Sequence, residues 1–222
     1  MLENTKIVKD TYDVIAKFFA PMLDEENSSK AEVAFMESYL ERLPVESTLI
    51  DLGCGAGKHG RYCAGRGHLV TGYDVSNEMI KRAKAYNEIY KMEFLAVEDM
   101  CEIKTTQMFD GVIAMYSLIH LTKDQTVRTF MNLASNIKEG AQIALCVNIG
   151  DGEGYFPEIL KPDMRQYFKY YQKDELVEVV ESVGIQVDDI CMWKDEDTIT
   201  ASNMELEYGV IGIIGTWRGG KK

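Results

Sequence analysis

The stretch IDLGCGAGKHG, residues 50–60, decides the fold, because an apolar segment runs directly into a glycine-rich turn. A buried strand that ends in such a turn and leads into a helix is a general nucleotide cradle, since the glycines allow close backbone approach and the helix N-terminus favours a negative group. The glycines can be read in two registers. One starts at Gly55 and spells G-x-G-x-x-G, the dinucleotide-binding fingerprint. The other starts at Gly53 and spells G-x-G-x-G, with Asp51 just ahead of it.

An acidic residue about 20 positions beyond such a turn, at the end of the second strand, can accept hydrogen bonds from both hydroxyls of a ribose. Asp74 in GYDVS fills this position in either register, 19 residues past Gly55 and 21 past Gly53. The spacing therefore indicates a nucleoside-containing ligand but does not choose the register.

Three features favour the shorter register. The dinucleotide register would hold Asp51 among the apolar residues of a central strand, where a carboxylate is costly without partners, whereas the shorter register puts it at the strand's end beside the turn. None of the twelve tyrosines has a lysine four residues on, although small hydride-transferring domains usually carry a Tyr-x-x-x-Lys proton donor. The antiparallel tail predicted below is also foreign to the common dinucleotide-binding sheet.

The composition is that of one reduced, globular domain. The 222 residues suit a single domain with a substantial core. The formal net charge of −12 repels a phosphate backbone, so we expect no nucleic-acid partner. The five cysteines are odd in number and form no C-x-x-C pair, which argues against a disulfide framework or a zinc cluster, so we expect no metal.

The chain shows no targeting or membrane signal. Residues 1–13 lack the apolar core of a signal peptide, and no apolar run approaches the ~18 to 20 residues that a membrane span needs. We therefore expect a cytoplasmic protein without a membrane partner. The sequence is silent on the oligomeric state.

The N-terminal part of the chain is predicted to be helical, and alternating strands and helices follow it. Apolar residues at helical spacing predict amphipathic helices over 7–23 and 30–43, which form an N-terminal helical cap of residues 1–44 on a single domain spanning 1–222. From residue 48 strands and helices alternate, which predicts a doubly wound, mostly parallel sheet. The expected strands lie at 48–53, 68–74, 93–99, 109–117 and 141–149, and the expected helices at 58–65, 76–90 and 122–138, with Ser76 and Thr122 as N-caps of the last two.

The pattern changes after the fifth strand. Residues 150–172 are rich in glycine and aromatic residues, and we expect a long loop or lid there that walls the substrate site. A helix over 173–184 follows, with Gly184 as its C-cap. Two strand-like segments, 185–193 and 205–218, are joined without a crossover helix, so they are expected to be antiparallel. The prediction is an α/β fold with a mostly parallel seven-stranded sheet and an antiparallel C-terminal hairpin.

The motifs, taken in order, resemble a known family. LIDLGCGAGKHG, GHLVTGYDVSNEMIKRA, LAVEDM and FDGVIAMYSLIHL look like the successive motifs of the class I S-adenosylmethionine-dependent methyltransferases, from about residue 48 to residue 149. The tail from YYQKDELVEVVESVG to GIIGTWR, and the N-terminal YDVIAKFF, are also similar to small-molecule members of that family. The resemblance implies a Rossmann-like fold, S-adenosylmethionine as cofactor, S-adenosylhomocysteine as product and a small-molecule acceptor that it does not name.

Carried over to matching positions, the resemblance implies a set of cofactor contacts. They are Asp51, Gly53, Cys54, Gly55 and Gly57 around the methionine moiety, Asp74 at the ribose hydroxyls, Val75, Asp99 and Met100 at the adenine, Met115 beside the sulfonium, and Tyr12, reaching the cofactor's carboxylate from the N-terminal helix. Simpler interpretations stay open for three of them: Asp74 caps the following helix, Asp99 is a turn residue and Tyr12 belongs to the core. Cys54 has no base or cation beside it, so we expect no nucleophilic role.

Methyl transfer from a sulfonium is an in-line displacement with an activated donor, so orientation and water exclusion are the protein's main contribution. A base is needed only if the acceptor is protonated at working pH. His120 in SLIHL and Tyr116 are the candidate catalytic residues, and a histidine that merely supports the next helix is the open alternative for His120.

The acceptor site is expected over the C-terminal ends of the strands. Its candidate contacts are Tyr155, Arg165, Tyr167 and Tyr170. The aromatic rings favour a flat or apolar acceptor, and Arg165 is a candidate for holding an anionic group. In the alternative interpretation these rings only pack the lid onto the sheet.

Two rival functions follow from the same residues. An NAD(P)-dependent oxidoreductase would bind NADH through the dinucleotide register. A non-catalytic S-adenosylmethionine-binding module would bind that cofactor without ever turning it over.

Overall fold

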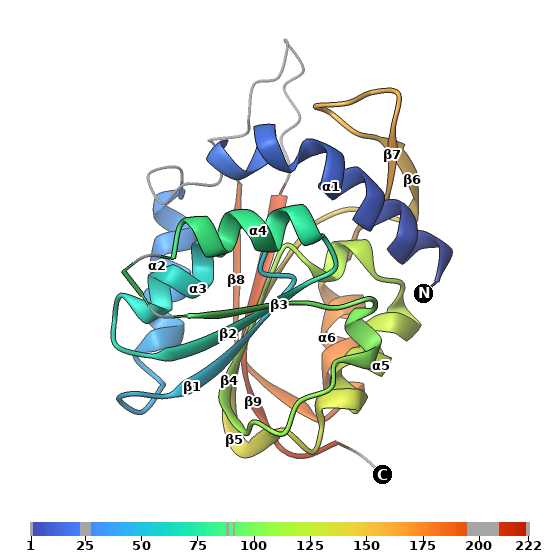
Figure 1. Ribbon diagram of the computed structural model, residues 1–222. Helices are drawn as coiled ribbons and strands as arrows, with labels where there is room; N and C mark the ends of the chain where they lie inside the picture. The colour runs from blue at the N-terminus through green and yellow to red at the C-terminus, as the bar shows by residue number, and fades with distance from the viewer. Residues whose placement is uncertain (1, 23–27, 88, 91, 195–208, 221–222) are drawn as a thin grey trace.

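The computed structural model describes residues 2–22, 28–87, 89–90, 92–194 and 209–220. A seven-stranded sheet forms its centre, and helices cover both faces (Figure 1). The strands of this sheet are β1 Thr48–Leu52, β2 Leu69–Asp74, β3 Glu93–Ala96, β4 Phe109–Met115, β5 Ile137–Asn148, β8 Ile185–Lys194 and β9 Gly209–Trp217. They lie in the order β3-β2-β1-β4-β5-β9-β8.

The strand directions confirm the predicted fold class. Strands β1 to β5 are mutually parallel, and β9 runs antiparallel to both β5 and β8. The expected C-terminal hairpin therefore forms one edge of a doubly wound sheet. The segment that joins β8 to β9, which the sequence analysis expects to be a linker, lies outside the described residues.

The helices follow the predicted order. They are α1 Glu3–Met22, α2 Lys30–Leu40, α3 Lys58–Ala64, α4 Asn77–Ala85, α5 Lys123–Leu133 and α6 Lys173–Ser182, with the short 3-10 helices η2 Met100–Glu102 and η3 Leu118–His120. Ser76 and Thr122 cap α4 and α5 as predicted, and Thr122 does so in a reciprocal capping box with Gln125. Within the described ranges no helix is long and apolar enough to cross a bilayer.

Two predicted helices are too long, because other contacts end each helix early. Helix α4 ends at Ala85 instead of residue 90, since the side chain of Asn87 exchanges hydrogen bonds with the backbone of Met92. Helix α5 ends at Leu133 instead of residue 138, since Ile137 already pairs with Phe109 to begin β5. These side-chain hydrogen bonds and this strand pairing outweigh helix propensity.

Alternate residues of the central strands face two separate cores. Ile50 and Val112 belong to a cluster that includes α5 and α6, whereas Leu49 and Ile113 belong to a cluster that includes Phe35 of α2. The predicted N-terminal cap is therefore divided. Helix α2 packs on a face of the sheet, while α1 lies across α4 and the inserted hairpin (Figure 1).

Residues 150–172 are not the expected loop but contain a β-hairpin. Strands β6 Glu153–Pro157 and β7 Arg165–Lys169 pair antiparallel as a separate two-stranded sheet. Helix α1 packs against β7, and the hydroxyl of Thr11 donates to the Arg165 carbonyl at 3.1 Å. The insertion thus stands beside α1 at the C-terminal end of β5.

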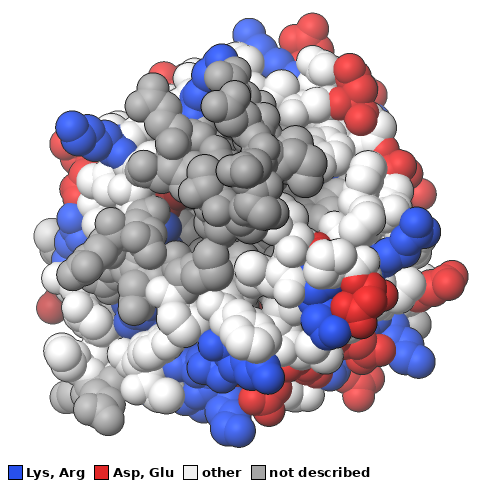
Figure 2. Space-filling model, turned by 90° about the horizontal axis from the view of Figure 1, so that it is seen from above, with Lys and Arg blue, Asp and Glu red and all other residues white. Residues whose placement is uncertain are grey.

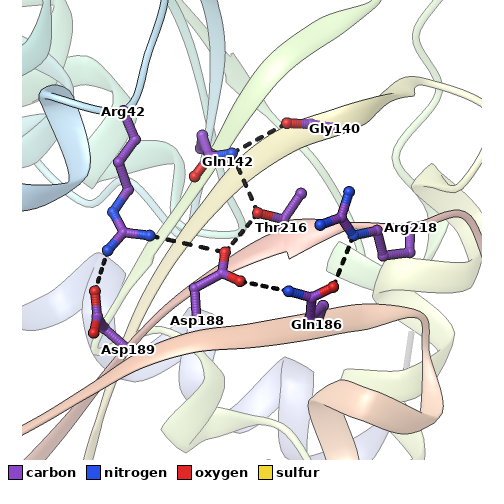
Figure 3. A network of polar contacts seen from close by, with 8 residues as sticks. All are labelled: Arg42, Gly140, Gln142, Gln186, Asp188, Asp189, Thr216 and Arg218. Atoms are coloured by element: carbon purple, nitrogen blue, oxygen red, sulfur yellow. Dashed lines mark hydrogen bonds and ion pairs between the residues drawn. The ribbon is translucent and has the colours of Figure 1, made fainter.

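A polar network fixes the edge strand at the opposite end of the sheet (Figure 3). Asp188 lies where the β8 register shifts, and it accepts hydrogen bonds from the Thr216 hydroxyl at 2.5 Å and the Gln186 amide at 2.8 Å. Arg42, which follows α2, contacts both Asp188 and Asp189. These contacts fix the start of β8 in the sheet, and they lie far from the glycine turn.

We predict that Asn4→Ala lowers the free energy of unfolding by about 1 to 3 kcal/mol. Asn4 on α1 and Gln125 on α5 are both buried and exchange amide hydrogen bonds of 2.7 and 3.1 Å, so the substitution leaves the Gln125 amide short of partners. Chemical denaturation measures the effect. Lys6→Ala, at an exposed position of the same helix, is the matched control. Equal losses in both variants would mean that α1 is not fixed through Asn4.

Candidate functional site

The turn after β1 has glycines where no other residue fits. Gly53 has φ +69°, and a Cβ there would lie 2.4 Å from the Cβ of Ser117, just beyond β4. Gly57 has φ +86°, and a Cβ there would lie 2.7 Å from the ring of Phe94 on β3. The turn is therefore held between the C-terminal end of β4 and the side chains of β3.

The carboxylate of Asp74, the last residue of β2, joins this turn to the helix beyond it. Its Oδ2 accepts a hydrogen bond from the Gly55 N–H at 2.8 Å, and its Oδ1 accepts one from the Ser76 N–H at 2.8 Å. Burial raises the pKa of Asp74 to about 6, against these two bonds, which lower it. Asp74 does not itself cap α4, because the N-cap is Ser76; it holds the N–H of that cap residue and, through its other oxygen, the glycine turn.

Asp51 does not lie at the end of its strand as expected. It is inside β1, paired with Gly72 of β2 and Ile113 of β4, and only 1% exposed. Burial raises its pKa to about 6, and the nearby His59 is the largest opposing effect. One argument for the shorter register therefore fails, because the central strand does hold a buried carboxylate. The choice of register is left to the topology and to the comparisons below.

The other predicted cofactor contacts near β2 and β3 are buried. Val75 and Met100 share one apolar cluster. Asp99 caps η2 through a hydrogen bond from the Cys101 N–H at 2.9 Å, which agrees with the turn interpretation and leaves its second oxygen for other contacts. Burial raises the pKa of the Cys54 thiol well above its usual value, so this cysteine stays protonated.

Met115 and Tyr116 follow each other at the end of β4, beside the glycine turn. Met115 is buried, and Tyr116 is half-buried with φ +56°, a left-handed conformation that is uncommon for a bulky residue. Its N–H donates to the Cys146 carbonyl at 2.9 Å. Backbone strain of this kind clusters at functional sites, which adds to the case for Tyr116.

Helix α1 covers the glycine turn. The Asp13 carboxylate accepts hydrogen bonds from the Ser76 hydroxyl at 2.7 Å and from the Glu78 N–H at 3.1 Å, so α1 is fixed to the start of α4. Ala16 of α1 packs in one cluster with Ala56 of the turn. A ligand on the turn would therefore be enclosed by α1.

Tyr12 and His120 form a hydrogen-bonded pair next to this cover. His120 Nδ1 lies 2.9 Å from the Tyr167 carbonyl and must be the protonated nitrogen, so Nε2 accepts from the Tyr12 hydroxyl, also at 2.9 Å. Burial lowers the pKa of His120 to about 4. Burial also raises the pKa of Tyr12, with further contributions from the charges of Glu158 and Asp74. Tyr12 thus lies between the glycine-turn side and the hairpin.

The predicted acceptor contacts divide into two groups. Tyr155 and Tyr167 pair across the hairpin at 5.6 Å between ring centroids, and Phe156 and Tyr170 do so at 5.7 Å, so these rings pack against one another within this segment. The side chain of Arg165 is exposed, and its carbonyl is what contacts α1.

Sequence reasoning missed four residues of this region. They are Asp13, Ser117, Glu158 and Gln166. Asp13 directly follows Tyr12, and Ser117 directly follows Tyr116. Their places beside candidate site residues are the sequence signal that points to them. Glu158 and Gln166 lie in residues 150–172, which the sequence predicts as a loop, and no alternation of apolar and polar residues indicates the strands there.

We predict that Asp51→Asn stabilises the protein at pH 7.5 by about 1 to 3 kcal/mol and leaves it unchanged at pH 4. The raised pKa means that the folded protein binds this proton more tightly than the unfolded chain does, so stability falls as the pH rises from the usual 3.8 to about 6. Denaturant unfolding at both pH values measures the difference. Asp10→Asn, an exposed carboxylate on α1, is the control. Equal destabilisation of Asp51→Asn at both pH values would contradict the expected linkage.

Comparisons with known proteins point in one direction. Residues 49–140 match the sequence family described as a methyltransferase domain. A ubiquinone biosynthesis O-methyltransferase of Coxiella burnetii is 29% identical over 157 residues, which cover 64% of this chain and 64% of that protein. The corresponding O-methyltransferase of Nitrosomonas europaea is 27% identical over 158 residues, covering 63% and 64%. The chain thus spans just under two thirds of the length of these curated relatives.

Solved structures share the fold. A methyltransferase of Methanosarcina mazei superposes with a TM-score of 0.67 at 18% identity, covering 80% of this chain and 95% of that one. The magnesium protoporphyrin IX methyltransferase of Synechocystis, with bound S-adenosylmethionine, superposes with a TM-score of 0.64 at 16% identity, covering 96% and 98%. Taken with the sheet order, the glycine turn and Asp74 at the end of β2, these matches show that the chain shares the fold of solved S-adenosylmethionine-dependent methyltransferases and that its residues 49–140 are similar in sequence to a methyltransferase domain.

Proposed function

We propose that this protein transfers the methyl group of S-adenosylmethionine to a small-molecule acceptor. The observation that carries the proposal is the buried Asp74 carboxylate, bonded to the glycine turn on one side and to the start of α4 on the other. A carboxylate offers about four acceptor positions. The backbone N–H groups around Asp74 use part of this capacity, and the rest is available to the hydroxyls of a ribose.

The other residues at the turn fit the same cofactor. The Ser117 hydroxyl lies against Gly53, is buried, and has no hydrogen-bond partner among the described residues, which suits a polar ligand group at the turn. Val75 and Met100 supply apolar surface for an adenine, and Asp99 keeps an oxygen for its amino group. When bound, S-adenosylmethionine supplies a methyl group already activated on its sulfonium.

The enclosure favours a small acceptor. Thr11 binds the Arg165 carbonyl, and Tyr12 is linked through His120 to the Tyr167 carbonyl, so α1 and the hairpin are fastened together over this end of the sheet. The relatives named as ubiquinone biosynthesis O-methyltransferases support a small-molecule acceptor as well. We expect the protein to act in the cytoplasm, without a nucleic-acid or membrane partner.

The outer face of this enclosure carries both charged and uncharged side chains. Figure 2 looks down on it and shows a patch of side chains other than Lys, Arg, Asp and Glu beside residues that are not described, with charged side chains around it. Phe18 on α1 and Ile159 in the hairpin loop are each 53% exposed. Exposed apolar side chains on α1 and in the hairpin suit an acceptor with an apolar or aromatic body.

His120 acts, in this proposal, as a positioning residue rather than as a base. Both of its ring nitrogens are engaged, and it holds the Tyr12 hydroxyl at 2.9 Å. Tyr116, at the end of β4, is the candidate catalytic contact and helps to orient the acceptor toward the methyl group. The protein then accelerates transfer by alignment and by excluding water, which needs no titrating imidazole.

We predict that Asp74→Ala weakens the binding of S-adenosylhomocysteine by about 1 to 3 kcal/mol, because ribose hydroxyls lose their charged acceptor. Isothermal titration calorimetry measures this loss. Glu98→Gln, at an exposed carboxylate one residue before Asp99, is the control and should bind as the unchanged protein does. Full affinity in Asp74→Ala would remove Asp74 from the site and, with it, the main support for this function.

We predict that the His120 imidazole stays neutral from pH 8 down to about pH 5, since its pKa lies near 4. Proton NMR of the imidazole C–H signals follows this titration without any acceptor. His120→Gln identifies the signal, and the resonances of His59 and His68 serve as internal references. A midpoint near 6.5 for His120 would contradict the buried, doubly bonded ring and would restore it as a candidate base.

A further inference from the structure

A buried carboxylate without a cation partner lies in the inserted hairpin. Glu158, which directly follows β6, is 7% exposed. Its Oε1 accepts a hydrogen bond from the Leu160 N–H at 3.1 Å, and its Oε2 accepts one from the side-chain amide of Gln166. In the part of the chain that is described, no Lys, Arg or His lies within 4.0 Å of it. A buried charge without a counter-ion is costly and calls for a reason.

Its neighbour Gln166 has an unused hydrogen-bond acceptor. Gln166 is 1% exposed, and its Nε2 donates to Glu158, yet its Oε1 is buried without a partner among the described residues. Buried amide oxygens are nearly always bonded. The pair therefore presents one amide oxygen without a donor and, beside it, a carboxylate that has two neutral donors but no cation among the described residues.

The pair is held beside the site described above. Residues on both sides of Gln166 are fixed through their carbonyls, since Thr11 of α1 binds the carbonyl of Arg165 and His120 of η3 binds that of Tyr167. Tyr12, the residue after Thr11, bonds to His120. Strand β7 is thereby fastened to α1 and to η3, and Gln166 lies at the centre of that attachment.

We propose that Glu158 and Gln166 form a subsite that binds an ammonium group of the methyl acceptor. An ammonium has three N–H donors and one positive charge, which match the unserved amide oxygen of Gln166 and the carboxylate of Glu158 that lacks a counter-ion. This inference rests on the proposed function and names the class of acceptor, a small molecule with an amino group. The ammonium is the group that is recognised, and the methylated atom is a different one.

The charged residues of β7 argue against an anionic group at this subsite. Arg165, the expected anion contact, is exposed. Lys169, the other cation of β7, is ion-paired with Glu175 at 2.8 Å and lies close to Glu153 at 3.6 Å. Among the described residues, an anionic acceptor would thus meet Glu158 without a cation in ion-pair contact with that carboxylate, which reverses the expectation based on Arg165.

The first test needs no ligand. Glu158→Gln removes the charge but keeps the shape, and its amide can pair with the Gln166 amide. The melting temperature of the ligand-free protein should rise by about 2 to 4 °C. Asp163→Asn, at an exposed carboxylate in the same hairpin loop, should change it by less than about 1 °C. A fall in Glu158→Gln would make Glu158 a structural residue and overturn the proposal.

The second test compares three probes of similar shape on the complex with S-adenosylhomocysteine. They are tyramine, which is cationic, 4-ethylphenol, which is neutral, and 3-(4-hydroxyphenyl)propanoate, which is anionic. Tyramine should bind roughly 10-fold or more tightly than 4-ethylphenol, and the anion most weakly. Glu158→Gln should abolish the preference, while Asp163→Asn keeps it. Equal binding of the three probes, no binding of tyramine, or a preference that survives in Glu158→Gln would each overturn the subsite.

The two proposals fail in different ways. S-adenosylhomocysteine should stabilise the unchanged protein and Glu158→Gln equally, because Glu158 does not contact the cofactor in this account. Absence of that stabilisation in both would refute the proposed function whatever the probes do. Stabilisation by S-adenosylhomocysteine without discrimination among the probes would refute the ammonium subsite alone.

Discussion

The Asp74 carboxylate is the contact on which the arrangement of the site depends. It is buried, yet both of its oxygens are bonded, one to the N–H of Gly55 and one to the N–H of Ser76. A buried carboxylate needs such partners, and backbone N–H groups are strong ones. Because the two donors belong to different connections of the sheet, the glycine turn and the start of α4 are held in one geometry by one side chain.

The cover over the site is built outward from that contact. The Ser76 hydroxyl donates to Asp13, which brings α1 onto α4. The residue before Asp13 is Tyr12, and its hydroxyl is bonded to His120, which in turn is bonded to the hairpin. Hydrogen bonds, joined through the neighbouring residues Asp13 and Tyr12 of α1, therefore link the glycine turn to the hairpin. Enclosure of this kind suits a displacement reaction, whose protein contribution is alignment and exclusion of water.

The fold and the geometry of the glycine turn could be predicted because their signals are local. The strand, the glycine turn and Asp74 all lie within residues 48–74, and their spacing follows from one βαβ unit. The position of Asp51 inside β1 could not be predicted, because the end of a strand is set by its pairing with two neighbours. The hairpin was missed because glycines, prolines and aromatic rings obscure the period-2 pattern of its strands.

The acceptor side depends on contacts that no local pattern encodes. His120 is bonded to Tyr12, 108 residues earlier, and to Tyr167, 47 residues later. A motif identifies His120 as a candidate base, but only the tertiary structure shows that both nitrogens are engaged. Similarly, Glu158 is an ordinary acidic residue in the sequence, and its isolation from every described cation is a property of the folded chain.

The most direct test of the central claim is a thermal-shift comparison of S-adenosylmethionine, S-adenosylhomocysteine and NADH on the purified protein. A ligand at 100 times its dissociation constant adds about 2.7 kcal/mol to the stability. For a chain of this size that corresponds to a rise of about 5 to 10 °C. The account predicts this rise with the two sulfur cofactors and none with NADH. A rise with NADH alone would mean that the glycines serve the dinucleotide register, and would contradict the assignment of the site.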